Sequence, residues 1–173
     1  LLVEEVTPPA DGGKPIGWKL LTSLPLDSFE AACQAVRWYS YRWLIERYHF
    51  TLKSGCKIED LQLQHRDRLL KALATYSIVA WRLMAMTYQA RLTPDVSCEV
   101  IFTPKEWKLL RRRFVPKSRL KKPPTLHQAT HWLARLGGFQ GRKGDGEPGI
   151  KTLWRGYTKL QHLLEGAQLA KKT

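Results

Sequence analysis

The sequence predicts a mainly α-helical, α+β fold with a short antiparallel β hairpin at its N-terminal end. Two long segments, residues 66–91 and 150–170, repeat apolar side chains at the i, i+3, i+4 and i+7 spacing of an amphipathic helix. Two short β-prone runs, residues 1–6 and 16–22, flank a loop rich in proline and glycine, which is typical of a hairpin. A hydrophobic fraction of 43%, with seven tryptophans, is sufficient for a buried core.

Helices are expected to follow the hairpin. The first is predicted to begin at Asp27, an N-cap residue with Glu30 three positions later, and to lead into a helix over residues 39–53. Ser54 and Gly55 indicate where that helix stops. The helix over residues 66–91 is apolar nearly all round in its middle, so we expect it to pack against the preceding domain. Its end near residue 93 divides the chain into predicted domains 1–92 and 93–173.

The second half of the chain is predicted to be helical and strongly basic. Helices should begin at Thr103, followed by proline at the first turn, and at Thr125, and the last helix should run from about residue 150 to 170. A basic stretch over residues 105–122 either contacts phosphate groups or is a solvated loop. Its charged members are Lys105, Lys108, Arg111, Arg112, Arg113, Lys117, Arg119, Lys121 and Lys122.

The formal net charge of +14 favours a polyanionic partner, with nucleic acid ahead of an acidic membrane surface. The most apolar run, residues 78–86, contains Arg82 and is too short to span a bilayer. Three widely spaced cysteines predict reduced thiols in a cytoplasmic protein, with neither disulfides nor structural zinc. His127 and His131 are spaced i, i+4, but no acid or cysteine lies nearby in sequence, so we interpret them as surface or packing residues.

The segment over residues 39–53 carries the strongest functional pattern. On a helix, Tyr39, Arg42, Glu46 and Lys53 fall within an arc of roughly 60°. A second stripe, about 120° away, is predicted to face the core. It consists of Tyr41, Ile45, Tyr48 and Leu52. Spacing alone would also fit an exposed Arg–Glu pair that contributes only a few tenths of a kcal/mol.

The pattern Tyr-x2-Arg-x3-Glu-x6-Lys resembles the signature of bacterial cut-and-paste transposases with an Asp-Asp-Glu triad, the group that includes the transposon-five transposase. Trp43, directly after the arginine, and His49, three residues past the glutamate, also fit that family. Residues 17–23 and 134–139 extend the similarity, which runs through most of the chain.

The resemblance implies a function for each part. The hairpin and first helices would be the last part of a ribonuclease-H-like catalytic domain, in which Glu46 is the third carboxylate holding Mg²⁺ or Mn²⁺. The two aspartates would lie upstream of Leu1, which makes the chain a C-terminal fragment. Residues 93–173 would form a homodimerisation domain. The family also implies DNA-binding roles. The DNA backbone would be contacted by Tyr39, Arg42, Lys53 and His49. A flipped base would stack on Trp18 and Trp43.

The protein would then act in DNA transposition, in the bacterial cytoplasm and on the nucleoid when DNA-bound. Two alternatives stay open at this point. One is a non-catalytic basic helical protein that binds DNA or RNA. The other is a truncated transposase that inhibits intact copies by forming mixed dimers.

Overall fold

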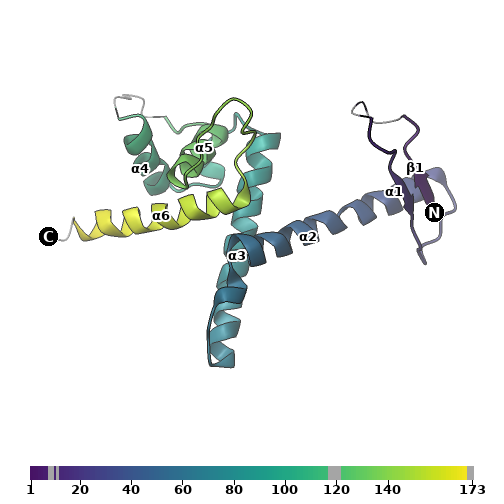
Figure 1. The fold of residues 1–173 in the computed structure, drawn as a ribbon, viewed down its shortest axis with the longest axis horizontal. Helices are drawn as coiled ribbons and strands as arrows, with labels where there is room; N and C mark the ends of the chain where they lie inside the picture. Colours follow the sequence, from purple (N-terminus) through teal and green to yellow (C-terminus); the bar gives the residue numbers. More distant parts are fainter. Residues whose placement is uncertain (8–9, 11, 117–121, 171–173) are drawn as a thin grey trace. The chain divides into compact units, whose positions relative to one another are not determined.

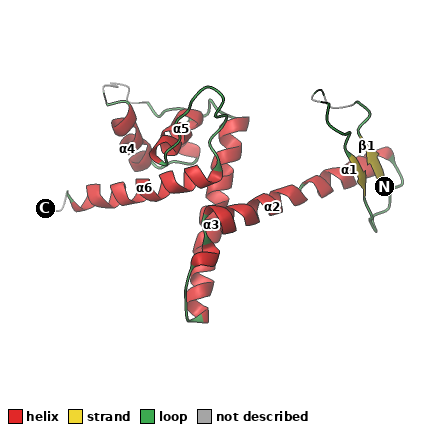
Figure 2. Cartoon of the chain, in the orientation of Figure 1, coloured by secondary structure: helices red, strands yellow, loops and turns green. Residues whose placement is uncertain are grey.

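The computed structural model describes residues 1–7, 10, 12–116 and 122–170, and the chain forms two compact units, Leu1–Glu46 and Arg47–Thr173. The fold is mainly helical with one two-stranded antiparallel sheet (Figure 2), so the predicted fold class is confirmed. The division of the chain at residue 92 stays a prediction.

The hairpin of the first unit is shorter than the two β-prone runs that predicted it. Strand β1 (Leu2–Glu4) pairs with β2 (Gly17–Lys19), and Val3 lies opposite Trp18. The pairing continues beyond both strands, because the Leu1 amino group donates to the carbonyl of Leu20 over 2.9 Å. The predicted turn-rich loop, residues 7–13, lies partly outside the described residues.

The predicted single helix over residues 39–53 is wrong in detail, because it is divided in two places. Helix α1 (Phe29–Ser40) begins after Ser28, not Asp27, since the Ser28 hydroxyl accepts the Ala31 N–H at 3.1 Å. A tight turn at Tyr41 separates α1 from α2 (Arg42–Phe50). There the Tyr41 N–H donates to the carbonyl of Trp38, three residues back, and the Tyr41 backbone keeps helical dihedral angles.

A π-helical turn, η1 (Thr51–Gly55), follows α2 and ends at the predicted glycine. Leu52 is buried and Tyr48 packs against the core, as the apolar stripe predicts. Tyr41 and Ile45 are more than half exposed, so the predicted core face is correct only in its second half. A short 3₁₀ turn, η2 (Ile58–Asp60), connects η1 toward the next helix.

Helix α3 (Arg66–Leu92) is the central element of the second unit. Its C-terminal half lies among η3 (Cys98–Val100), α4 (Pro104–Phe114), α5 (Leu126–Leu136) and α6 (Ile150–Leu169), as Figure 1 shows. It contributes five buried residues: Ala80, Leu83, Met86, Thr87 and Ala90. Its core contacts are with η1, which precedes it, and also with the helices that follow it, which the sequence did not predict.

The two halves of α3 differ in burial. Leu69, Leu70 and Leu73 in the N-terminal half are each 42–50% exposed. By length and composition alone α3 would be long and apolar enough to cross a membrane. It nevertheless carries Arg82, whose guanidinium lies 2.8 Å from the Glu106 carboxylate, and the half around this pair forms part of a protein core.

The Arg82–Glu106 pair joins three helices of the second unit. Arg82 also donates to the Tyr157 hydroxyl on α6, at 2.6 Å, and to the carbonyl of Ile101, at 2.9 Å. Glu106 accepts from the backbone N–H of Thr103, so the same carboxylate closes the capping box of α4. The Glu106 carboxylate is almost fully buried, and a buried charge is costly unless it is paired and hydrogen-bonded. These hydrogen bonds offset that cost.

Helices α5 and α6 cross at two glycines. A Cβ added to Gly156 would lie 2.9 Å from the Leu133 carbonyl carbon and closer still to its oxygen. A Cβ added to Gly137 would lie 3.1 Å from the Thr152 carbonyl carbon. The backbones therefore approach closely, which buries Leu133 and Leu153 on either side of the crossing.

Candidate functional site

Three residues of the sequence signature form a polar cluster on the surface of the first unit. Arg42, at the start of α2, forms an ion pair with Glu46 one turn later. The guanidinium carbon of Arg42 lies 5.3 Å from the ring centroid of Tyr39, at the end of α1. Both charged side chains are nearly half exposed. The predicted shared face of Tyr39, Arg42 and Glu46 is thus present in the structure.

Two tryptophans extend this cluster into an aromatic patch. Trp18 of β2 is half-buried and makes an edge contact with Tyr39, with ring centroids 5.4 Å apart. The guanidinium of Arg42 lies 5.8 Å from the ring of Trp43, which is 53% exposed. We call these five residues the signature patch: Trp18, Tyr39, Arg42, Trp43 and Glu46.

Lys53 and His49 belong to the second unit and are described separately. The Lys53 ammonium lies 2.8 Å from the Glu59 carboxylate, and this hydrogen bond raises the pKa of the lysine. Glu59 follows the helix in a short polar connection, and no pattern in the sequence indicates that it pairs with Lys53. His49 is exposed and makes an edge contact with Tyr48, at 5.7 Å between ring centroids.

Chemically, the signature patch offers one carboxylate beside several hydrogen-bond donors and aromatic faces. Carboxylate oxygens are ligands that Mg²⁺ accepts, and Glu46 is exposed enough to supply one. A magnesium ion needs about six oxygen ligands, so Glu46 can only be part of a larger set. The patch therefore fits a metal ligand with anion-binding neighbours, and it does not make a complete metal site.

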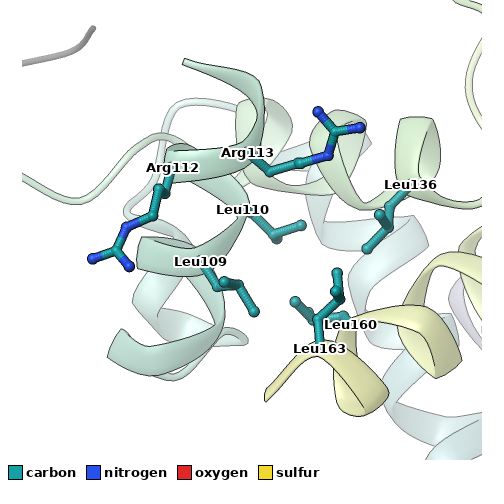
Figure 3. Close-up of a pocket in the computed structure, with 7 residues that line it drawn as sticks. All are labelled: Leu109, Leu110, Arg112, Arg113, Leu136, Leu160 and Leu163. Carbon is teal, nitrogen blue, oxygen red and sulfur yellow. The ribbon is translucent and has the colours of Figure 1, made fainter. Parts of the chain in front are cut away.

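A second candidate site is an apolar hollow between α4, α5 and α6, with a volume of about 210 Å³ (Figure 3). The side chains of Leu109, Leu110, Leu136, Leu160 and Leu163 point into it, and the guanidinium groups of Arg112 and Arg113 lie at its edge. A neighbouring hollow of about 470 Å³ extends along α4 and the last turns of α6. Lys105, Lys108, Leu164 and Ala167 line that part. We call the two hollows together the α4–α6 groove.

The groove separates the apolar residues of α6 into two groups. Leu160 is fully buried inside its own unit, so it is a core residue. Leu163 is 44% exposed, and Leu164 is partly exposed. The predicted apolar stripe of the last helix is present, but its outward-facing part begins only after Leu160.

Part of the basic stretch is engaged within the chain. Arg111 lies over the ring of Trp107, at 4.7 Å, and donates to the carbonyl of Lys122. Lys117, Arg119 and Lys121 of this stretch, for which phosphate contact and a solvated loop are both open, lie outside the described residues.

The structure also brings Glu147 to the two histidines of α5. Its carboxylate oxygens lie 3.2 Å from Nε2 of His131 and 3.5 Å from Nε2 of His127. Glu147 lies in the loop between α5 and α6, and sequence spacing did not indicate its contact with α5. Partial burial would raise the pKa of Glu147, but the hydrogen bond from His131 and the two imidazole charges lower it overall.

The helical second unit, with its apolar groove, has the features of an association module, and a comparison of the sequence with known families agrees. Residues 78–173, more than half of the chain, match the family described as the transposase Tn5 dimerisation domain. The chain therefore belongs to this family and is a C-terminal region of a Tn5-like transposase. Membership in a family of dimerisation domains supports homodimer formation by this chain.

Proposed function

We propose that the chain is the C-terminal part of a metal-dependent cut-and-paste DNA transposase, in which it supplies the catalytic Glu46 and the dimer contact. The observation that carries this proposal is the exposed Glu46 carboxylate, held by Arg42 beside Tyr39, in a chain that continues into a transposase dimerisation domain. The spacing of these three residues is the one that the transposase signature requires.

In this proposal Glu46 holds Mg²⁺ or Mn²⁺ together with two aspartates from another part of the catalytic domain. The two ions would activate the attacking oxygen and stabilise the leaving oxygen of the scissile phosphate. When Glu46 turns to a cation, the donors of Arg42 become available to a DNA phosphate, which suits a bidentate guanidinium. Arg42, Tyr39, Lys53 and His49 would hold the DNA backbone near the reacting phosphate.

The two tryptophans of the signature patch suit an unstacked base. A flipped nucleotide loses the stacking of its neighbours and needs an aromatic plane in exchange. Trp43 is exposed over about half of its surface, so one side of its ring can accept a base. Trp18 lies against Tyr39, which would fix its orientation before DNA binds.

The homodimer contact is assigned to the α4–α6 groove. Its floor is apolar, Leu163 is exposed at its edge, and basic residues surround it. Burying such a surface against a second copy removes leucine side chains from water, which is the main driving force for stable association. A two-fold arrangement would bring two transposon ends into one assembly.

The test uses the transposase that contains this chain. Glu46→Gln should abolish strand cleavage in Mg²⁺ while end binding, measured by gel shift, is retained, because the substitution removes a metal ligand and leaves the phosphate contacts. Glu30→Gln, an exposed glutamate of the same unit, is the control and should cleave normally. Normal cleavage by Glu46→Gln would show that the signature is a surface ion pair.

A further inference from the structure

Outside the signature patch, one cluster of side chains has the composition of a transition-metal site. His127 and His131 are one turn apart on α5, so both imidazoles project from the same face of the helix. Their ring centroids are 4.2 Å apart. Glu147 reaches the same point from the loop before α6, and one ligand atom from each residue lies within 4.8 Å of the other two.

The distances are compatible with a shared metal ion as well as with hydrogen bonding. With metal–ligand bonds of about 2.1 Å, neighbouring ligand atoms of a tetrahedral site are about 3.4 Å apart. The two histidine–carboxylate distances, 3.2 Å to one oxygen of Glu147 and 3.5 Å to the other, are close to this spacing. The 3.5 Å distance between His127 and Glu147 is longer than a usual hydrogen bond, so hydrogen bonding alone holds this contact only weakly.

The chemistry of the ligands selects the kind of metal. Two imidazoles and one carboxylate suit Zn²⁺ and other late transition metals, whereas Mg²⁺ prefers oxygen ligands. The site is thus different in type from the one proposed at Glu46. All three side chains are partly exposed, between 27% and 42%, so metal can enter from solvent and a water molecule can take the fourth position.

We propose that His127, His131 and Glu147 form a Zn²⁺-binding site that fastens the loop between α5 and α6 onto α5. This loop contains three glycines with positive φ, at positions 141, 144 and 146, so its backbone is intrinsically free to take other conformations. A metal bond to Glu147 would restrict it at the point where it turns toward α6. The site would stabilise the second unit without taking part in phosphoryl transfer.

The test is Zn²⁺ titration of the 173-residue chain by calorimetry, after treatment with a chelator that is then removed. One Zn²⁺ should bind per chain, and binding should raise the melting temperature, because the ion binds the folded state. Co²⁺ in its place should give the visible absorption of a four-coordinate site. Both Glu147→Gln and His131→Ala should weaken Zn²⁺ binding by roughly 100-fold or more.

The control is His162→Ala, which removes an exposed histidine of α6 and should bind Zn²⁺ like the unsubstituted chain. Because the three proposed ligands are partly exposed, the metal-free variants should melt at the same temperature as the metal-free parent. If His131→Ala does not fold, Glu147→Gln alone tests the site. Absence of binding would overturn the proposal. So would binding that survives both substitutions, or binding that is lost equally in His162→Ala.

Discussion

The crossing of α5 and α6 yields a prediction whose sign is opposite to the usual effect of the same substitution. Replacing glycine with alanine inside a helix normally stabilises it by about 1 kcal/mol. At Gly156 the new methyl group would lie 2.9 Å from the carbonyl carbon of Leu133 and closer to its oxygen. Carbon atoms in contact are normally at least about 3.5 Å apart, so the two helices would have to separate by about 0.6 Å or more.

The atoms that the methyl group meets belong to the backbone of α5, so no side-chain rotation can relieve the overlap. Overpacking of this kind costs about 3 kcal/mol, at the upper end of the usual range. The gain in helix propensity offsets about 1 kcal/mol. We therefore expect Gly156→Ala to lower the free energy of unfolding by about 2 kcal/mol.

Gly166 provides a matched control in the same helix, because a Cβ added there would meet nothing within 4 Å. Gly166→Ala should stabilise the chain by up to about 1 kcal/mol. Urea denaturation followed by circular dichroism measures both variants, and their midpoints should shift in opposite directions. If Gly156→Ala is as stable as Gly166→Ala, the close backbone approach does not exist.

Two further predictions concern buried groups of the second unit. Arg82→Met should destabilise the chain by about 3–5 kcal/mol in urea denaturation, because it leaves a buried carboxylate without its cation, whereas Arg91→Met at the exposed end of α3 should have little effect. At pH 8, iodoacetamide should modify exposed Cys33 and leave Cys56 and Cys98 unmodified. Burial raises the pKa of the Cys56 thiol to about 11 and that of Cys98 to about 12, so both stay protonated at pH 8. Rapid alkylation of either thiol at pH 8 would contradict the assigned burial.

Local signals in the sequence predicted the elements of the second unit well. Thr103 forms the predicted N-cap, Thr125 caps the helix that was predicted to begin there, and α6 begins at the predicted residue 150. These features depend on a few neighbouring residues, whose hydrogen bonds are local. No proline or glycine marks the division of helix 39–53 at Tyr41.

The features that the sequence did not predict depend on contacts between distant residues. Leu160 and Leu164 continue the same apolar stripe, but Leu160 is fully buried and Leu164 is partly exposed, so periodicity could not separate core from surface. Glu147 lies 16 residues after His131, and only the return of the loop brings them together. The signature patch was predictable in large part, because Tyr39, Arg42 and Glu46 are within two turns of each other.

The second unit is proposed to form the homodimer through the α4–α6 groove. The direct measurement is the mass of the 173-residue chain in solution by sedimentation velocity, comparing the parent with Leu163→Asp. Leu163 is used because it is exposed, so a charge there should leave the fold intact, as circular dichroism would verify. Leu73→Asp, on the exposed half of α3 outside the groove, is the control. We predict that the parent and Leu73→Asp are dimers and that Leu163→Asp is a folded monomer. A parent that is monomeric at every concentration would contradict the proposed dimer contact. So would a Leu163→Asp variant that remains dimeric.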